Sequence, residues 1–585
     1  MKKLAAILAL GAAMTAATAP AQKISADGAQ QTFRFYVDQY FDDVFNFSPT
    51  YGTQAGFHQY DGRLEDYSAA AVQTQIKSMR EWQKKFEAVP AEGLDGSVAD
   101  DRQVLLNNIE SNLLSLETIR MWEKNPDNYS SGITNSIFVL MSRDFAPVDT
   151  RLRAAVEREK LMPQVFLEAR KNLKNPPKIY TQIAIEQIPG IVSFFENDVP
   201  LAFSKATSAE TKADFAKSNK AVIDALKSYG DWLKSDLLPR SNGDFRFGEA
   251  TFRKKLALDE MVDLPLDKLV EIDMANMRAN QAEFARIAKE LDPAKTPEQV
   301  LAELGNIHPA PDKLLNAFQD TFNSLISFVR AKKIITIPSD VQPTLEETPP
   351  FMRATTFASM DPPGAYEKNS TKAYFNVTLP EKDWTAAHVA EHMASFNIGT
   401  IISTAVHEAY PGHYVQFLWQ SQFPSKVRKL TMSASNVEGW AHYTEQMMLD
   451  EGYGQPGSGA KDDREAKLIR LGQLQDALLR NARFIVGLKM HTGQMTFDEG
   501  VDFFVKEGYQ SRASATVETK RGTADALYMY YTLGKLEILK LRDDVKKKQG
   551  AAFSLEKFHD DLMRQGPVPI KIIRKSMLHD NSPVL

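Results

Sequence analysis

Apolar residues recur at helical spacing over much of the first half of the chain. Between residues 215 and 233 they are Phe215, Val222, Ile223, Leu226, Tyr229 and Leu233, with charged residues on the positions between them. This period puts one apolar stripe on a helix, which other helices must cover. Segments 266–291 and 314–329 have the same pattern. We therefore expect a mainly α protein, in which residues 22–333 form a helical scaffold.

The segment 334–379 has a different character. It contains three short runs rich in β-branched and aromatic residues, at 334–337, 354–358 and 373–377, separated by Pro, Gly and Asp. Such runs predict a small β-sheet. Helical patterns then return and continue to the end, interrupted by a Gly-rich loop at 452–459. We expect one large domain over 22–585, whose second part, 334–585, carries the sheet.

Cysteine is absent from all 585 residues. Disulfides, a thiol nucleophile, a cysteine-linked lipid and cysteine zinc ligands are therefore not expected, and histidine and carboxylate must hold any metal. The formal net charge is −5, with acidic and basic residues interspersed. Since no basic stripe is present, nucleic acid is not an expected partner.

The first residues have the form of a secretory signal peptide. Met1-Lys2-Lys3 supplies a basic start, residues 4–18 are rich in Ala and Leu, and Ala19-Pro20-Ala21 ends the run with small residues. This pattern predicts cleavage after Ala21 and export to the periplasm or beyond, with no stable membrane anchor.

Five of the ten histidines lie between positions 388 and 442, and carboxylates are interleaved with them. A lone histidine is usually a core residue, but histidines grouped with carboxylates favour a metal site. The histidines are His388, His392, His407, His413 and His442, and the interleaved carboxylates are Glu391, Glu408 and Glu438.

Two motifs within this cluster compete. His388-Val-Ala-Glu391-His392 places two histidines one helical turn apart, and matches an inverted zinc-peptidase pattern. His407 and His413 are six residues apart, which on a regular helix separates their rings by about 240°. Pro411 and Gly412 lie between them, and can kink or bulge the helix so that the two rings meet. Alternatively, Pro411 and Gly412 end the helix and leave His413 in a loop.

A helix-compatible segment after His413 supplies a third candidate ligand. Glu438 follows His413 by 25 positions. Zinc peptidases of the gluzincin type take two histidines from one helix and a glutamate from a second helix about two dozen residues later, with another glutamate as general base. Glu408, next to His407, has the position expected of that base.

The motif His-Glu-x-x-Pro-Gly-His at 407–413, followed by Glu-Gly-Trp-Ala at 438–441, resembles the bacterial domain of unknown function 885 (DUF885) family, grouped with zincin-like peptidases. Segments 49–52, 60–64, 482–491 and 531–535 resemble other motifs of that family, so the resemblance covers nearly the whole chain after the signal peptide. Gly487 stands where the family commonly has Asp, and Tyr414 where it often has a second histidine.

A wider similarity is to thimet oligopeptidase and angiotensin-converting enzyme, which are helical zinc peptidases of two lobes with a narrow channel for short peptides. This resemblance implies a zincin-like body with a central cleft and a small sheet near the active site. It also implies one zinc ion per chain, held by His407, His413 and Glu438, with Glu408 moving the proton. The motif of His388 and His392 then lies on the preceding helix and does not bind zinc.

Other polar residues near the end of the chain are candidates for stabilising the reaction and holding the substrate. Tyrosine hydroxyls and histidines donate hydrogen bonds to a developing oxyanion, and arginine binds a carboxylate with two hydrogen bonds. Tyr531 and His491 are the candidate catalytic donors. Candidates for substrate binding are Arg483, Arg521, Tyr530 and Lys535. We also expect the strand at 373–377 to pair with an extended peptide, and Trp440 to pack between the site helices.

The function expected from these features is zinc-dependent hydrolysis of peptide bonds in short peptides. A metallohydrolase acting on a non-peptide amide is an alternative, because the motif specifies how the bond is activated and not what flanks it. An exported helical binding protein without catalysis is a second alternative.

Overall fold

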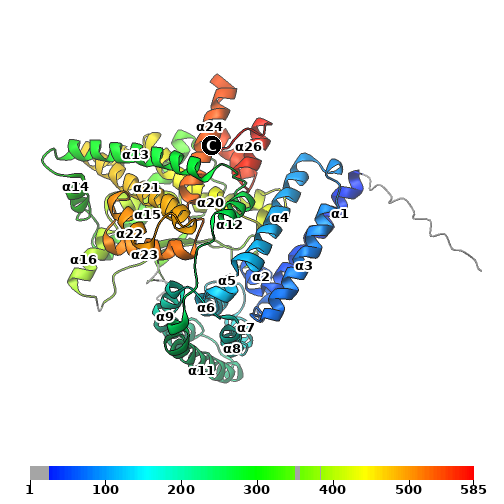
Figure 1. Ribbon diagram of the computed structural model, residues 1–585. Helices are drawn as coiled ribbons and strands as arrows, with labels where there is room; N and C mark the ends of the chain where they lie inside the picture. The colour runs from blue at the N-terminus through cyan, green and yellow to red at the C-terminus, as the bar shows by residue number, and fades with distance from the viewer. Residues whose placement is uncertain (1–25, 349–352, 354–355, 383) are drawn as a thin grey trace, which may run out of the picture.

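We describe a computed structural model of the chain, which covers residues 26–348, 353, 356–382 and 384–585 (Figure 1). The predicted signal peptide at 1–21 lies outside the described residues. Within the described part of the chain, no helix is both long enough and apolar enough to cross a membrane. The fold is mainly helical, as the apolar periodicity predicts.

Long helices near the N-terminus lie side by side at one edge of the molecule (Figure 1). Phe33 and Phe86 meet edge to face here, with ring centres 5.7 Å apart. These aromatic contacts join the main apolar core, which extends into the second half of the chain. The helices are α1 (Ala26–Phe47), α2 (Pro49–Ala55), α3 (Ala69–Glu87) and α4 (Gly96–Leu114).

The next group of helices forms a separate lobe at the bottom of Figure 1. It has an apolar core of its own, drawn from residues 129–237. Tyr180 ties this lobe to the rest by donating a hydrogen bond to the carbonyl of Thr523. The helices are α5 (Met121–Lys124), α6 (Asp127–Met141), α7 (Val148–Glu159), α8 (Met162–Asn172), α9 (Lys178–Ser193), α10 (Val199–Ala202) and α11 (Ala209–Trp232).

The four helices that follow this lobe in the sequence and precede the sheet pack against the second half of the chain. Helix α13 lies along α21 (Asp463–His491), and the two share an apolar core with α22 (Phe497–Lys506). The scaffold predicted for residues 22–333 thus shares its core with the second part. The four helices are α12 (Glu249–Asp259), α13 (Leu266–Leu291), α14 (Pro297–Leu304) and α15 (Leu314–Lys332).

The small sheet has three strands, β1 (Thr344–Glu347), β2 (Ala358–Asp361) and β3 (Tyr374–Val377). Strand β3 is central, parallel to β1 and antiparallel to β2. The prediction that 373–377 pairs with a peptide is therefore wrong, because both edges of β3 are already paired. A second pair of very short strands, β4 (Gln455–Pro456) and β5 (Gly459–Ala460), forms the predicted loop at 452–459.

Helices α17 and α20 hold His407 and Glu438, and each approaches a neighbour through glycine. A Cβ on Gly399 of α17 would lie 2.9 Å from the Cα of Gly472 of α21, and a Cβ on Gly439 of α20 would lie 2.5 Å from the Cα of Gly534 of α24. Only glycine allows backbones so close. The helices are α16 (Ala386–Ala394), α17 (Ile398–Glu408), α18 (His413–Leu418), α19 (Lys426–Leu430), α20 (Ala434–Asp450), α23 (Arg512–Ala524), α24 (Tyr530–Gln549), α25 (Leu555–Arg564) and α26 (Ile570–Leu578).

The predicted elements agree with the structure except at the sheet. Helices α13 and α15 start where the sequence pattern starts, and α11 covers most of 215–233. The predicted strand at 334–337 is wrong, since these residues are an irregular segment after α15, of which Ile334 and Ile335 are buried. The second strand begins at Ala358, later than predicted, and residues 354 and 355 lie outside the described residues.

Candidate metal centre

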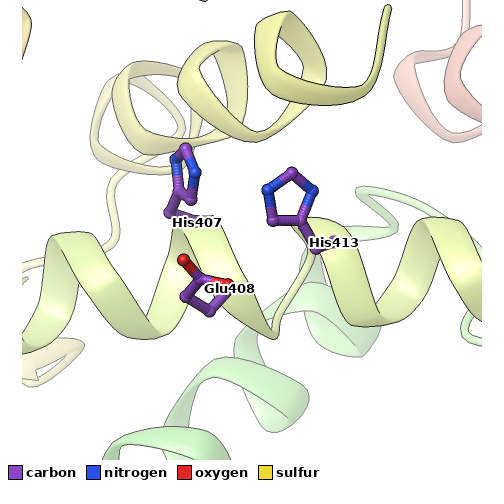
Figure 2. A group of neighbouring side chains, drawn as sticks. All are labelled: His407, Glu408 and His413. Atoms are coloured by element: carbon purple, nitrogen blue, oxygen red, sulfur yellow. The ribbon is translucent and has the colours of Figure 1, made fainter. Parts of the chain in front are cut away.

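The helix is interrupted between His407 and His413. Helix α17 ends at Glu408, a short link follows, and α18 begins at His413 (Figure 2). The link contains a cis peptide bond before Pro411, and the amide of Gly412 donates to the carbonyl of Val406 at 2.9 Å. The expected distortion is therefore a break between two helices. His413 is the first residue of a new helix instead of a loop residue.

Gly412 and Trp440 together fix this link. A Cβ on Gly412 would lie 1.8 Å from the carbonyl oxygen of His407 and 2.4 Å from that of Val406, so no other residue fits without moving the backbone. From α20, the indole N–H of Trp440 donates to the carbonyl of Pro411 at 3.0 Å. Trp440 is fully buried and joins α20 to the link between α17 and α18.

The break brings the two histidine rings together. Their centres are 4.8 Å apart, and both rings point towards the same side of the α17–α18 segment (Figure 2). From α20, one carboxylate oxygen of Glu438, Oε2, lies 3.4 Å from Nε2 of His407 and 3.4 Å from Nε2 of His413. Tetrahedral zinc with bonds of about 2.0–2.1 Å separates its ligand atoms by about 3.3–3.4 Å. The spacing therefore fits a small tetrahedral cation.

Glu408 stands beside these three residues from a different direction. One of its carboxylate oxygens lies within 4.8 Å of ligand nitrogens of both histidines. Its Oε2 accepts a hydrogen bond of 3.1 Å from the amide of Met360 in β2. The sheet thus fixes the orientation of Glu408. The side chain of Glu408 is half-buried and lies near the two histidines, but Glu408 is not one of the three residues that meet at Glu438 Oε2.

A buried network lies behind His407, on the side away from Glu438. Nδ1 of His407 donates to Glu445 Oε1 at 2.6 Å, and the same oxygen is 3.0 Å from Nη2 of Arg480. The other oxygen of Glu445 accepts from Nδ1 of His442 at 3.1 Å. A carboxylate behind a metal-binding histidine fixes the tautomer and the orientation of the ring.

Sequence reasoning gave Glu445 and Arg480 no role. The position of Glu445 contained a signal, because it follows Glu438 by seven residues and so lies on nearly the same face of the helix. Arg480 comes from α21, 35 positions after Glu445, and no local pattern links the two residues.

Electrostatics favour charged side chains at this centre. Burial alone lowers the pKa of His407, but its hydrogen bonds to Glu438 and Glu445 outweigh burial and raise the pKa to about 10. Burial opposes the charge of Glu438, yet His413 and His407 hold the pKa of that carboxyl well below its usual range. The arrangement therefore stabilises a positive charge between the two carboxylates.

Tyr531 lies next to the centre, as expected of a donor to an oxyanion. Its ring centre is 6.4 Å from that of His407. Its hydroxyl accepts a hydrogen bond of 3.2 Å from Arg521, and Tyr530 donates to Asp525 at 2.8 Å. The structure brings Tyr531, Tyr530 and Arg521 into one group beside the histidines.

The remaining candidates are placed differently. Arg483 lies over the Tyr531 ring but makes two hydrogen bonds to Glu518, of 2.7 and 2.8 Å. Lys535 is fully buried, and burial lowers its pKa to about 8, so it presents no surface to a substrate. His491 is also fully buried. Its Nε2 hydrogen-bonds to the carbonyl of Gly522 at 2.8 Å, so its contacts among the described residues do not involve the histidine pair.

The rival motif does not assemble. His388 stacks on Trp384 with ring centres 3.9 Å apart, and Nε2 of His392 hydrogen-bonds to the carbonyl of Thr378 at 2.8 Å. Among the described residues, His407, Glu408 and His413 are grouped with ligand atoms within 4.8 Å of one another, and neither His388 nor His392 belongs to this group.

Comparison with known proteins gives a family without an established function. Residues 49–577 match the family described as "Bacterial protein of unknown function (DUF885)", and the chain belongs to this family. No curated protein matches.

Two solved structures share the fold. One is described as a "putative lipoprotein of unknown function" from Shewanella oneidensis, with 26% identity and a TM-score of 0.77, over 95% of this chain and 100% of that one. The other, a "putative lipoprotein" from Colwellia psychrerythraea, has 16% identity and a TM-score of 0.78, over 95% and 99% of the two chains. The present sequence has no cysteine that could carry a lipid.

The two departures from the family motifs have local structural explanations. Tyr414 donates a hydrogen bond to the carbonyl of Val341 at 2.6 Å. A Cβ on Gly487 would lie 2.5 Å from the ring of Tyr528, so Tyr528 fills the space of a side chain at that position. Neither residue is among the groups that meet at Glu438.

Proposed function

We propose that this protein is an exported zinc-dependent hydrolase that cleaves peptide bonds in short peptides. The observation that carries the proposal is the convergence of His407 Nε2 and His413 Nε2 on one oxygen of Glu438, each at 3.4 Å. His407, His413 and Glu438 would hold one zinc ion. The bound ion would supply a Lewis acid and lower the pKa of a coordinated water.

The protein side chains around the ion have separate roles in this mechanism. Glu408 takes a proton from the attacking water and returns it to the leaving amine, since a carboxylate beside the centre can act as both base and acid. Met360 holds that carboxylate in place through its amide, at 3.1 Å. Tyr531 donates its hydroxyl hydrogen to the oxyanion that forms at the attacked carbonyl.

Glu445 keeps His407 ready for binding. With Nδ1 donating to Glu445, the Nε2 of the ring is directed towards Glu438. A ligand held this way does not need to reorient when the ion arrives, which lowers the entropic cost of binding.

Metal analysis and peptide digestion test this proposal together. The purified protein is expected to contain about one zinc ion per chain and to cleave members of a short-peptide library, with activity lost on chelation and restored by zinc. His413→Ala should lose the metal, Glu408→Gln should keep the metal and lose cleavage, and His388→Ala should keep both.

The pattern of failure identifies which part is wrong. Loss of metal in His388→Ala, with metal kept in His413→Ala, would refute the ligand assignment. Bound metal without cleavage of any peptide would favour hydrolysis of a non-peptide amide. Absence of tightly bound metal would leave an exported helical binding protein as the better description.

A further inference from the structure

Three arginines surround one tyrosine ring beside the candidate metal centre. Their guanidinium carbons lie between 5.0 and 5.8 Å from the centre of the Tyr531 ring; they are Arg480, Arg483 and Arg521. A cation over a tyrosine face is attracted by the negative charge of the ring. Three cations so close together make this side of the centre attractive to an anion.

Two of these arginines are held by short contacts with carboxylates. Nη2 of Arg480 pairs with Glu445 at 3.0 Å, and Arg483 uses both Nε and Nη2 to hold Glu518. The side chains of Arg480 and Arg483 are only 12% and 10% exposed. They shape the positive region but have little surface for a ligand.

Arg521 is different in both exposure and hydrogen bonding. Its side chain is 39% exposed, and its contact with Asp525 is long, at 3.4 Å. Its hydrogen bonds to the hydroxyls of Tyr530 and Tyr531, of 3.3 and 3.2 Å, leave from the same atom, Nη2. In the described part of the chain, Nε and Nη1 of Arg521 have no partner. These free N–H groups can donate charge-assisted hydrogen bonds to a carboxylate.

The position of Arg521 limits how much substrate fits between it and the metal centre. The Tyr531 ring centre is 6.4 Å from the His407 ring and 5.8 Å from the guanidinium carbon of Arg521, so that carbon is at most about 12 Å from the His407 ring. An extended peptide advances about 3.3–3.6 Å per residue. The hydrogen-bonded carboxylate takes up about 3–4 Å of this span, which leaves room for one or two residues.

We propose that Arg521, held in place by its hydrogen bonds to the hydroxyls of Tyr530 and Tyr531, binds the free C-terminal carboxylate of the substrate. The enzyme would then remove one or two residues from the C-terminal end of short peptides. This inference rests on the proposed hydrolase function. In the reaction the C–N bond breaks, water supplies the oxygen of the new carboxylate, and the leaving amine takes a proton.

Paired peptides test the inference. A peptide with a free C-terminus is compared with the same peptide carrying a C-terminal amide, and the products are identified by mass spectrometry. Losing a charge-assisted pair should lower kcat/KM for the amide by about 10- to 100-fold, mainly through KM. The expected products are single residues or dipeptides from the C-terminus.

Arg521→Gln, with Arg512→Gln as its matched control, assigns the effect to one residue. Arg512 is an exposed arginine of the same helix and pairs with Asp502 at 2.7 Å, away from the tyrosines. Arg521→Gln should reduce the preference for the free acid over the amide to near one, whereas Arg512→Gln should keep the wild-type ratio. Metal content should be unchanged in both.

Peptide binding gives a second readout that does not need turnover. Calorimetry with Glu408→Gln should show tighter binding of the acid than of the amide, and Arg521→Gln in that background should remove the difference. Equal cleavage or equal binding of acid and amide by proteins with intact Arg521 would overturn this inference while leaving the proposed hydrolase intact. Absence of metal and of all cleavage would instead overturn the hydrolase, and this inference with it.

Discussion

Replacing Glu445 with glutamine tests whether the buried network behind His407 supports metal binding. Glutamine has nearly the same shape and keeps one oxygen, which can still accept from His407 and Arg480 as Oε1 does now. Its amide nitrogen would face Nδ1 of His442, which accepts when the proton of that ring is on Nε2. The substitution therefore removes the negative charge and keeps most of the geometry.

The expected magnitude follows from what each substitution removes. Loss of an outer carboxylate behind a ligating histidine typically costs 10- to 100-fold in metal affinity, or about 1.4–2.7 kcal/mol. Glu445→Gln should fall near the lower end, about 10-fold, because one acceptor oxygen stays near Nδ1 of His407. Glu445→Ala should fall near the upper end, about 100-fold, because both the charge and the hydrogen bond are lost.

Competition with a chelator of known zinc affinity measures this effect. Glu451→Gln is the matched control, since Glu451 is an exposed residue just beyond the same helix. Melting curves of the metal-free proteins separate a weaker metal site from a weaker fold. Wild-type zinc affinity in both Glu445 variants, with the fold intact, would refute the role of this network.

Three further predictions concern backbone contacts and pH. Gly412→Ala should abolish metal binding, because its Cβ would lie 1.8 Å from the carbonyl oxygen of His407; metal content checks it. Gly534→Ala should lower the melting temperature and the metal affinity, since its Cβ would lie 1.7 Å from the carbonyl oxygen of Ser435; calorimetry and chelator competition check it. Burial raises the pKa of Glu159 to about 8, so the folded state binds its proton more tightly than the unfolded state. Its stabilising contribution should be complete below about pH 4.5 and be lost as the pH rises through 8, by up to about 1.4 kcal/mol per pH unit. Denaturant titrations should show this decline in wild type and not in Glu159→Gln, and a decline that persists in the variant would contradict the assignment.

The break at the histidine motif was only partly predictable from sequence. Six residues of separation required a distortion, and Pro411 and Gly412 showed where it would occur. The outcome depends on Trp440, which lies on another helix and donates to the carbonyl of Pro411. Local sequence does not specify a contact of this kind, so a bulge within one helix and a break between two could not be distinguished.

The incorrect prediction of a strand at 334–337 also results from contacts that local sequence does not specify. Its β-branched residues fit a strand by propensity, but its backbone groups are taken by side chains. Asp560 accepts from the amide and the hydroxyl of Thr336, and Trp419 donates to the carbonyl of Thr336 at 3.2 Å. His559 hydrogen-bonds to the carbonyl of Ile334 at 2.7 Å. Tertiary contacts therefore override a modest strand propensity.

The two histidines of the candidate centre are supported to different degrees. His407 is held on both ring nitrogens by carboxylates of α20, since Nε2 faces Glu438 and Nδ1 donates to Glu445 two turns later. In the part of the chain that the structure describes, Nδ1 of His413 is buried without a hydrogen-bond partner. The position of His413 is set instead by its backbone, through the link that Gly412 and Trp440 fix. His407 is thus oriented by side-chain hydrogen bonds and His413 by its backbone. Both arrangements depend on the close approach of α20 to the α17–α18 segment.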